Sequence, residues 1–165
     1  MDVRELEIRE ALATEAEIVT SVLHEAADWL ARRGDPLWLP SEIEPTAIRS
    51  DVEAGCYLLA FAAGEAVGTA RLTRDDPLFW PEAAAGEAGY LHRLAVRRAH
   101  AGGSVSLEML RFAATRSRRW GASFLRLDCD AARPRLRAFY ESFGFAFHSV
   151  RTVGPHTVAR YEMQL

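Results

Sequence analysis

The sequence has no lysine, two cysteines and no long apolar run, and these shortages exclude several classes of protein. Cys56 and Cys129 are far apart in apolar surroundings, so they can form neither a disulfide framework nor a thiolate metal cluster. We interpret both as small buried hydrophobic residues. No stretch approaches the roughly 18 apolar residues of a membrane span. Six of the first ten residues are charged, unlike a signal peptide, so we expect a cytoplasmic protein with no membrane partner.

Proline and glycine are also too few for a collagen or a low-complexity chain. The sequence has 7 Pro and 11 Gly in 165 residues, and 49% of its residues are hydrophobic. That apolar fraction is too high for a chain that stays disordered. The length predicts one globular domain over residues 1–165.

Positive charge is unevenly distributed. All 20 basic residues are Arg, and residues 93–137 hold eleven of them against three acids. This stretch therefore carries +8, which leaves −11 for the remainder of a chain whose net charge is −3. The guanidinium group of Arg can bind two phosphate oxygens at once, which favours a site for a multiply phosphorylated ligand. Arg is also common on the solvated faces of helices. Charge alone does not decide between these two interpretations. The acidic remainder speaks against a nucleic-acid partner.

Hydrophobic periodicity predicts the element order βααβββαβαββ. A first helix from Thr14, as its cap, to Arg33 has its apolar stripe at Ile18, Val22, Leu23, Ala26, Trp29 and Leu30. Residues 56–62 and 66–73 have the spacing of an antiparallel hairpin. A strand over residues 90–96, a helix ending near Trp120 and a strand over 124–129 form a βαβ unit with parallel strands. The other predicted elements are a strand near residues 6–8, helices over 46–54 and 134–143, a loop over 75–86, and strands over 145–150 and 157–163.

A glycine-rich turn, Gly102-Gly103-Ser104-Val105-Ser106, leads into the helix of this unit. The first amides of a helix lack partners and lie at the positive end of its dipole, so such a turn can hold an anion. On its own, such a turn is more often a plain flexible turn with a helix cap. The turn matches neither a Walker loop nor the three-glycine dinucleotide motif, which excludes nucleotide hydrolysis and hydride transfer.

Three motifs carry a resemblance over nearly the whole chain. They are residues 91–98 with the glycine turn, residues 125–129, and the run Pro134-Arg135-Leu136-Arg137-Ala138-Phe139-Tyr140-Glu141-Ser142-Phe143-Gly144-Phe145. In this order they resemble the GNAT superfamily of acetyl-CoA-dependent N-acetyltransferases. The resemblance implies an α/β (α+β) fold with a mixed, mostly antiparallel sheet, a splayed central parallel pair and flanking helices. It also implies transfer of an acetyl group from acetyl-CoA to a primary amine.

The resemblance implies where the cofactor binds. Backbone groups of Leu94, Ala95 and Val96, on a bulged strand, are expected to bind the pantetheine arm. The pyrophosphate is expected on the amides of Ala101, Gly102, Gly103, Ser104, Val105 and Ser106. The family pattern Arg/Gln-x-x-Gly-x-Gly/Ala is replaced here by Ala101, Ser104 and Ser106. Arg133 stands where many relatives have an Asn, and it either pairs with phosphate or points to solvent.

Tyr140 is the predicted general acid. Its place in the Phe-Tyr-Glu run implies that its phenol protonates the CoA thiolate as the tetrahedral intermediate collapses. Leu136, Phe139, Tyr140 and Phe143 also form a helical stripe that is typical of core packing.

The general base has three candidates. Asp128 lies at the place where some family members carry a catalytic Glu, and it is expected to face away from Leu125, Leu127 and Cys129. Its structural alternative is a pair with Arg126 or Arg93. His92 has a suitable side chain on the splayed strand, although a histidine in a strand is more often a packing residue. Water alone is the third candidate.

The acceptor is a small-molecule or peptide amine, and the sequence does not select one. Trp29, Trp38, Phe79 and Trp80 are candidates for an aromatic wall, with Asp35, Asp75, Asp76 and Glu82 attracting a cationic amine. These residues can equally be core tryptophans and solvated acids. The five histidines show no tight ligand spacing, so we expect no metal. The alternative function is a non-catalytic GNAT-like module that binds an acyl-CoA or a partner, and a homodimer stays open.

Overall fold

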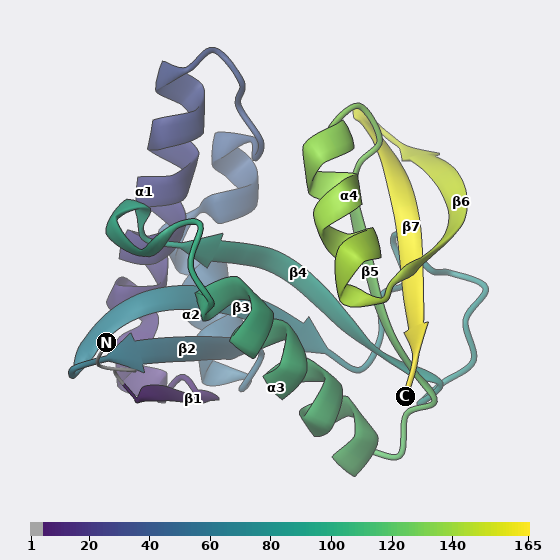
Figure 1. Ribbon diagram of the computed structural model, residues 1–165, viewed down its shortest axis with the longest axis horizontal. Coiled ribbons are helices and arrows are strands. Elements are labelled where there is room, and N and C mark those ends of the chain that lie inside the picture. The colour runs from purple at the N-terminus through teal and green to yellow at the C-terminus, as the bar shows by residue number, and fades with distance from the viewer. Residues whose placement is uncertain (1–4) are drawn as a thin grey trace. The chain divides into compact units, whose positions relative to one another are not determined.

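A computed structural model describes residues 5–165, in which the chain forms seven strands and four α-helices (Figure 1). The strands follow the order β1-β2-β3-β4-β5-β7-β6. The pairs β1–β2, β2–β3, β5–β7 and β6–β7 are antiparallel, whereas β4 and β5 run parallel. The predicted element order and the mixed, mostly antiparallel fold class are therefore confirmed. The splay of the parallel pair stays a prediction.

The described chain divides into two compact units. The first holds residues 5–71 and 93–110, and the second holds residues 72–92 and 111–165. Strand β4 (Ala88–Val96) and helix α3 (Val105–Arg119) each contribute residues to both. We describe each unit by itself, and the expectation of one domain over 1–165 stays a prediction.

The hairpin of the first unit forms as its sequence predicts. Strand β2 (Tyr57–Ala62) pairs antiparallel with β3 (Glu65–Thr73), and β1 (Leu6–Glu10) pairs with the other edge of β2. The two turn residues, Ala63 and Gly64, both have positive φ, 51° and 80°. Two left-handed residues are what the twist of a two-residue hairpin requires.

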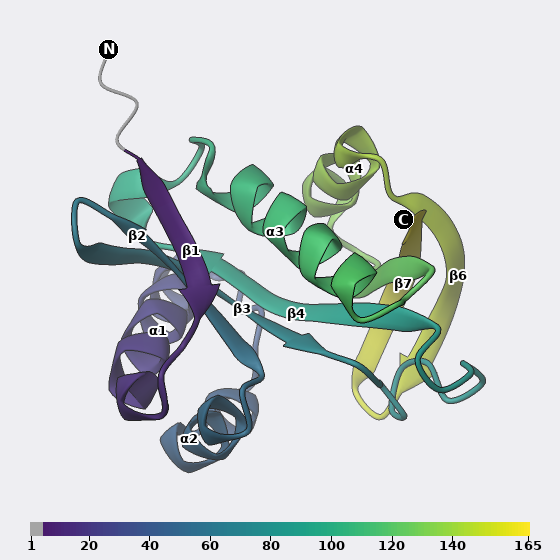
Figure 2. The same cartoon turned by 90° about the horizontal axis from the view of Figure 1, so that it is seen from below.

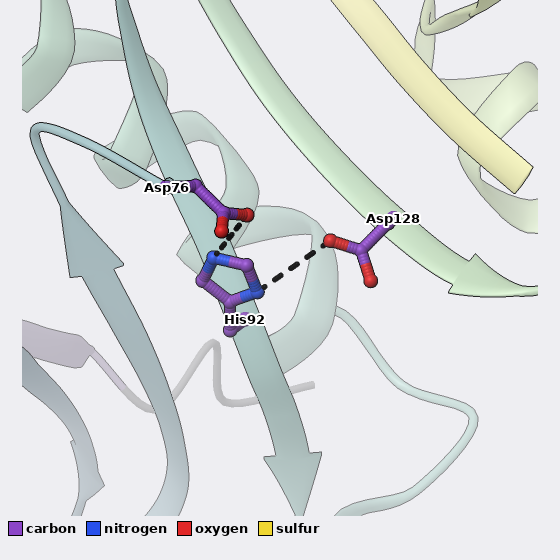
Figure 3. A group of neighbouring side chains, drawn as sticks. All are labelled: Asp76, His92 and Asp128. Atoms are coloured by element: carbon purple, nitrogen blue, oxygen red, sulfur yellow. Dashed lines mark ion pairs between the residues drawn. The ribbon is translucent and has the colours of Figure 1, made fainter. Parts of the chain in front are cut away.

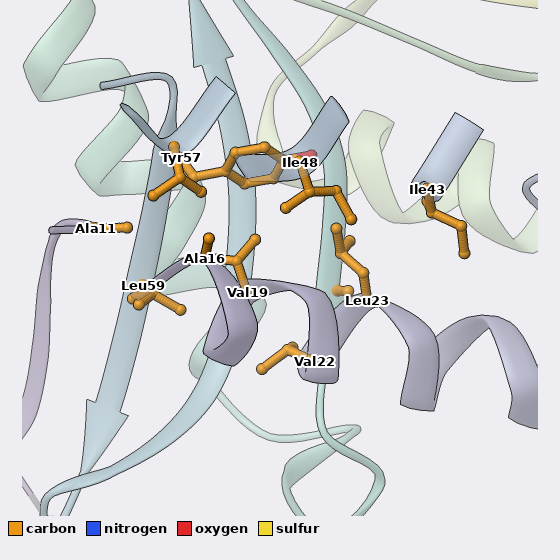
Figure 4. Close-up of a cluster of buried hydrophobic side chains, with 11 residues drawn as sticks. Ala11, Ala16, Val19, Val22, Leu23, Ile43, Ile48, Tyr57 and Leu59 are labelled. Carbon is orange, nitrogen blue, oxygen red and sulfur yellow. The ribbon is translucent and has the colours of Figure 1, made fainter. Parts of the chain in front are cut away.

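Helices α1 (Ala16–Arg32) and α2 (Pro45–Glu53) lie on the same side of the first-unit strands (Figure 2). They enclose a core made by α1, α2, β2 and Ala95 of β4, with residues Ala11, Ala16, Val19, Val22, Leu23, Ile43, Ile48, Val52, Tyr57, Leu59 and Ala95 (Figure 4). The prediction of Ile18 in the buried stripe is wrong, because the helix turns Val19 inward and leaves Ile18 exposed.

The start of α1 also differs from the prediction. Thr14 lies inside a short 3-10 turn (Ala13–Glu15) rather than at a helix cap. The Glu15 carboxylate accepts a hydrogen bond from the Leu12 amide at 2.8 Å and pairs with Arg9. This carboxylate caps the 3-10 turn, whereas α1 itself begins without a side-chain cap hydrogen bond, so the capping role expected of Thr14 is not observed.

The second unit is built on β5 (Phe124–Asp130), β7 (His156–Gln164) and β6 (Ala146–Val153), with α4 (Pro134–Phe143) beside them. Leu125, Leu127 and Cys129 of β5 are buried on one side, and Asp128 alternates with them as predicted. Cys129 is buried but Cys56 in the first unit is half-buried, so the interpretation of both as buried hydrophobic residues is wrong for Cys56.

Gly89 permits close packing between β4 and α3 within the second unit. A Cβ added at Gly89 would lie 2.0 Å from the Ser117 Oγ and 2.9 Å from its Cβ. Gly89→Ala is expected to lower the free energy of unfolding by about 2 kcal/mol or more, because the helix must shift to make room. The buried Ser117 Oγ has no hydrogen-bond partner among residues 5–165, so Ser117→Ala is expected to be neutral or stabilising. Urea unfolding measures the free energy of unfolding of both variants. Equal destabilisation by the two substitutions would contradict this prediction.

Candidate functional site

His92 lies between two carboxylates in the second unit (Figure 3). Its Nε2 is 3.3 Å from the Oδ2 of Asp76, and its Nδ1 is 3.7 Å from the Oδ2 of Asp128. The β4–β5 register pairs Leu91 with Leu127, so the next residues of the two strands, His92 and Asp128, are neighbours. The structure thus brings together two of the predicted general bases. We call Asp76, His92 and Asp128 the Asp-His-Asp cluster.

Asp128 has the electrostatics of a base that works near neutral pH. Burial raises the pKa of its carboxyl group to about 6, with Asp76 adding to the rise and His92 opposing it. The side chain is 10% exposed, and its Oδ2 has no hydrogen-bond partner in the part of the chain that the structure describes. Asp128 pairs with His92 rather than with Arg126, whose guanidinium binds Glu87 and Glu162.

Asp76 is the member of the cluster that the sequence suggests only as an acid for attracting the acceptor amine, and not as a partner of His92. It lies in the loop between β3 and β4, and its side chain is 7% exposed rather than solvated. The Oδ1 atom accepts a hydrogen bond from the Phe79 amide, and the Asp76 carbonyl accepts one from Trp80. Burial by itself would raise the pKa of Asp76, but His92 and the backbone donors outweigh it and lower the pKa. The Asp-Pro sequence indicates a turn here, and nothing local to it indicates His92 as a partner.

Trp80 fastens this loop to β5 and β7. Its ring, 3% exposed, lies under the guanidinium of Arg126 at 4.7 Å and that of Arg160 at 4.6 Å. Arg160 also donates hydrogen bonds to the Phe79 carbonyl and to Glu82. The hypothesis that Trp80 forms part of an acceptor-binding wall is wrong, because its ring is buried between two arginines. The loop is instead held in a fixed path that places Asp76 at His92.

Tyr140 lies in α4 with its side chain buried among aromatic rings. Its ring centre is 5.3 Å from that of Phe139 and 5.9 Å from that of Phe145. Burial raises the pKa of the phenol above its ordinary value, and electrostatic interactions with Cys129 and Asp128 add to the rise. A phenol in such a place keeps its proton at neutral pH, and the raised pKa makes it a weaker acid, so this shift does not by itself favour the acid role. The packing role that the helical stripe predicts is confirmed, and the acid role stays a prediction.

Strand β4 is irregular where the bulge is expected. Arg93 has φ 54°, a left-handed conformation that a non-glycine residue adopts rarely and that breaks the regular ladder. Its guanidinium donates a hydrogen bond to the Tyr57 hydroxyl at 3.0 Å, which fixes the side chain within the first unit. Ala95 is buried in the core, while Leu94 and Val96 are half-buried. The binding of pantetheine by these three residues stays a prediction.

The glycine-rich turn is exposed and leads directly into α3 in the first unit. Ala101, Gly102, Gly103 and Ser104 are exposed, Val105 is buried and Ser106 is half-buried. The Ser104 carbonyl accepts the amide of Glu108, so α3 begins just after Ser104 and presents its first amides at the turn. Gly102 has φ 79°, which strongly favours glycine, whereas a Cβ at Gly103 would meet the His100 carbonyl at an ordinary 3.4 Å. The turn therefore has the donors that a phosphate requires.

Arg133, the other predicted cofactor residue, lies at the start of α4 in the second unit. Its Nε is 3.4 Å from the Oδ2 of Asp130, three residues earlier, and the side chain is 14% exposed. Of the two alternatives, the one in which Arg133 simply points to solvent is wrong, because the side chain folds against its own turn.

A metal site requires several ligand atoms that lie close together. Within residues 5–165, the Asp-His-Asp cluster is the group whose candidate ligand atoms lie close together, all within 4.8 Å. His92 directs a different ring nitrogen to each carboxylate, so one ion would bind all three side chains only after they rearranged. The expectation of no metal stays a prediction.

No helix among the described residues has the length and apolar character to cross a membrane.

Comparison with known proteins gives consistent matches. The model of the acetyltransferase (GNAT) family matches residues 20–145. The chain is 30% identical over 153 residues to the uncharacterized N-acetyltransferase YesJ of Bacillus subtilis, a match that covers 88% of this chain and 84% of that protein.

Solved structures share the fold. A GNAT-family acetyltransferase from Listeria monocytogenes superposes with a TM-score of 0.83 and 27% identity, covering 97% of this chain and 95% of that one. The PaiA N-acetyltransferase of Thermoplasma acidophilum, in complex with coenzyme A, gives 0.77 at 17% identity, with coverage of 98% and 99%. The acetyltransferase YncA of Salmonella typhimurium, solved with acetyl-CoA, gives 0.73 at 15% identity, with coverage of 97% and 94%. The family match over most of the chain and the YesJ relationship together establish that this chain belongs to the acetyltransferase (GNAT) family.

Proposed function

We propose that the chain transfers the acetyl group of acetyl-CoA to a primary amine by direct attack. Family membership supports acetyl transfer, and relatives with the same fold bind coenzyme A or acetyl-CoA. The observation that carries the proposal is Asp128, a buried carboxylate with a pKa of about 6 beside His92. A base with a pKa near the working pH is what an enzyme requires to deprotonate an ammonium group.

The proposed reaction comprises four proton transfers and the exchange of a C–S bond for a C–N bond. The ammonium of the acceptor gives a proton to the Asp128–His92 pair, and the neutral nitrogen attacks the thioester carbonyl. A tetrahedral oxyanion forms, and strand amides near Leu94 stabilise it. The C–S bond then breaks, the Tyr140 phenol protonates the CoA sulfur, and the nitrogen releases its second proton to solvent as the amide forms. The Tyr140 phenolate is reprotonated from solvent.

Three groups of residues are proposed to bind acetyl-CoA. Backbone groups of Leu94, Ala95 and Val96 pair with the pantetheine arm, and the left-handed Arg93 supports a break in the ladder there. The exposed amides of residues 101–106 bind the pyrophosphate at the start of α3. Arg133 adds a positive charge, for which it must leave Asp130.

Calorimetric titration with acetyl-CoA tests this binding. A Kd on the order of micromolar is expected, and Gly103→Asp is expected to weaken it at least about 10-fold, because a carboxylate repels phosphate. The space at Gly103 accommodates a side chain, so the variant should fold, as circular dichroism can check. Ala13→Asp, at an exposed position at the start of the 3-10 turn, is the control for an added acid on the surface.

The same titration addresses the non-catalytic alternative. The departures at Ala101, Ser104 and Ser106 favour weakened cofactor binding. Binding of acetyl-CoA without thiol release, over a panel of small amines and peptide N-termini, would favour a binding module. Thiol release that depends on an added amine would establish the transferase.

A further inference from the structure

We propose that Asp76 is a positioning residue that holds the His92 ring with a proton on Nε2, so that Nδ1 faces Asp128 and the two side chains share one transferable proton. The inference rests on the proposed function for the use of that proton. It extends the function to a residue outside the strands, in the loop between β3 and β4, that binds neither acyl donor nor acceptor.

The geometry gives the two Asp76 oxygens different tasks. Oδ1 accepts a hydrogen bond from the Phe79 amide at 3.0 Å, which ties the carboxylate to the turn of its own loop. Oδ2 lies 3.3 Å from His92 Nε2 and has no hydrogen-bond partner elsewhere in residues 5–165. A carboxylate fixed at one oxygen and directed at an imidazole with the other selects the tautomer that it faces.

This tautomer determines what the other ring nitrogen can do. An ionised carboxylate accepts but cannot donate, so the Nε2 proton is directed at Asp76. Nδ1 then faces Asp128 Oδ2 at 3.7 Å, where two lone pairs oppose each other unless one proton lies between them. The His92–Asp128 pair therefore takes up a single proton. When the acceptor ammonium loses that proton, its N–H bond breaks, a new bond forms at Asp128 or Nδ1, and the charge of the cluster changes from −2 to −1.

The surroundings of the cluster favour uptake of one proton and not more. Tyr90 and His92 lie on β4, Asp76 comes from the loop, and Asp128 and Arg126 lie on β5. From β7, the charges of Arg160 and His156 act on Asp128 and oppose the rise in its pKa. Arg126 is engaged by Glu87, Glu162 and Tyr90. Within these described surroundings, His92 is the group that touches both carboxylates of the cluster.

Asp76→Asn tests the inference because it keeps the turn but reverses the hydrogen bond. The Asn carbonyl can still accept the Phe79 amide, whereas its NH₂ group donates to Nε2 and moves the imidazole proton to Nδ1. We expect kcat to fall about 10-fold or more with the KM for acetyl-CoA unchanged. The acid limb of the pH profile of kcat/KM is expected to move to lower pH, because Asp76 contributes to the raised pKa of Asp128.

Glu82→Gln is the matched control. Glu82 belongs to the same loop and pairs with Arg160, but it does not touch His92. The control is expected to weaken the loop's attachment and to leave the pH profile in place. Asp76→Ser, whose hydroxyl can cap the turn without a charge, is a second variant should Asp76→Asn fold poorly.

Nitrogen NMR of the His92 ring gives a readout that does not depend on activity. Neutral imidazole in the wild type is expected to carry its proton on Nε2, and in Asp76→Asn on Nδ1. An unchanged tautomer together with an unchanged pH profile would overturn the inference and leave Asp76 a loop residue. If no amine is acetylated by the wild type, the proposed function fails while the tautomer measurement still decides the role of Asp76. Stabilisation of the wild type, but not of Asp76→Asn, by Zn²⁺ or Mn²⁺ at equimolar concentration would overturn it in favour of a metal site.

Discussion

Tyr140→Phe is expected to lower kcat for amine-dependent release of CoA at least about 100-fold, with the fold retained. The loss arises because the variant has no proton to give to the departing sulfur, whereas the ring still packs against Phe139 and Phe145. The measurement is the rate of thiol release at saturating acetyl-CoA, together with the Kd for acetyl-CoA, which should not change. A leaving-group proton matters less for a more acidic thiol, so an activated thioester should recover part of the rate.

Tyr161→Phe is the matched control for this substitution. Tyr161 is also a buried tyrosine of the second unit, and its hydroxyl is bound by Arg137 and donates to Glu141 of α4. Loss of these bonds should reduce stability by about 1 kcal/mol or more and leave kcat within a few-fold. If Tyr140→Phe behaves like this control, Tyr140 is a packing residue and the general acid must be sought elsewhere.

Asp128→Asn is expected to move activity and stability in opposite directions. The variant loses the group that accepts the ammonium proton, so kcat/KM should fall about 100-fold or more and lose its acid limb. The folded protein holds the pKa of this carboxyl group at about 6, above its ordinary 3.8, so the native state binds the proton more tightly than the unfolded state. The favourable contribution is complete below pH 3.8 and is lost as pH rises through about 6.

The expected gain in stability of the Asp128→Asn variant follows from the raised pKa of Asp128. At pH 7 the ionised, buried Asp128 lowers wild-type stability by up to about 3 kcal/mol relative to acid pH, and an uncharged Asn removes that dependence. The difference in free energy of unfolding between variant and wild type should therefore grow from pH 4 to pH 7. Taking the difference cancels groups such as Glu15 and Glu87, whose pKa values are lowered in both proteins. A difference that does not vary with pH would contradict the assigned environment of Asp128.

The order of elements could be predicted because helix and strand periodicities are local. The alternation of Leu125, Leu127 and Cys129 correctly places Asp128 on the other side of its strand. The same reasoning failed at Ile18, because several residues of α1 fit an apolar stripe and the facing core selects Val19. Periodicity identifies an element but leaves its rotation to the packing of the unit.

The candidate site could be predicted only in part. Asp128 was a candidate because it matches the place of a catalytic Glu in some family members, and His92 because of its side chain on the strand expected to splay. The parallel register brings the two together. Asp76 was considered only among acids that attract a cationic amine or are solvated, and not as a partner of His92. Its burial depends on Trp80, whose place between Arg126 and Arg160 joins residues far apart in the sequence. Contacts between residues so far apart in the sequence leave no pattern in the local sequence. The pKa of Asp128 depends on contacts of this kind.

The position of Trp80 also allows the loop to be followed by tryptophan fluorescence. An indole ring held beneath two guanidinium groups and 5.0 Å from the His148 ring has an emission energy and a quantum yield set by those neighbours. Any molecule that displaces the loop by a fraction of an ångström changes that emission, whether or not it is turned over. The difference between the wild type and a Trp80→Phe variant isolates this signal from the other three tryptophans. Acceptor candidates can thus be ranked by a fluorescence titration before any product has been identified.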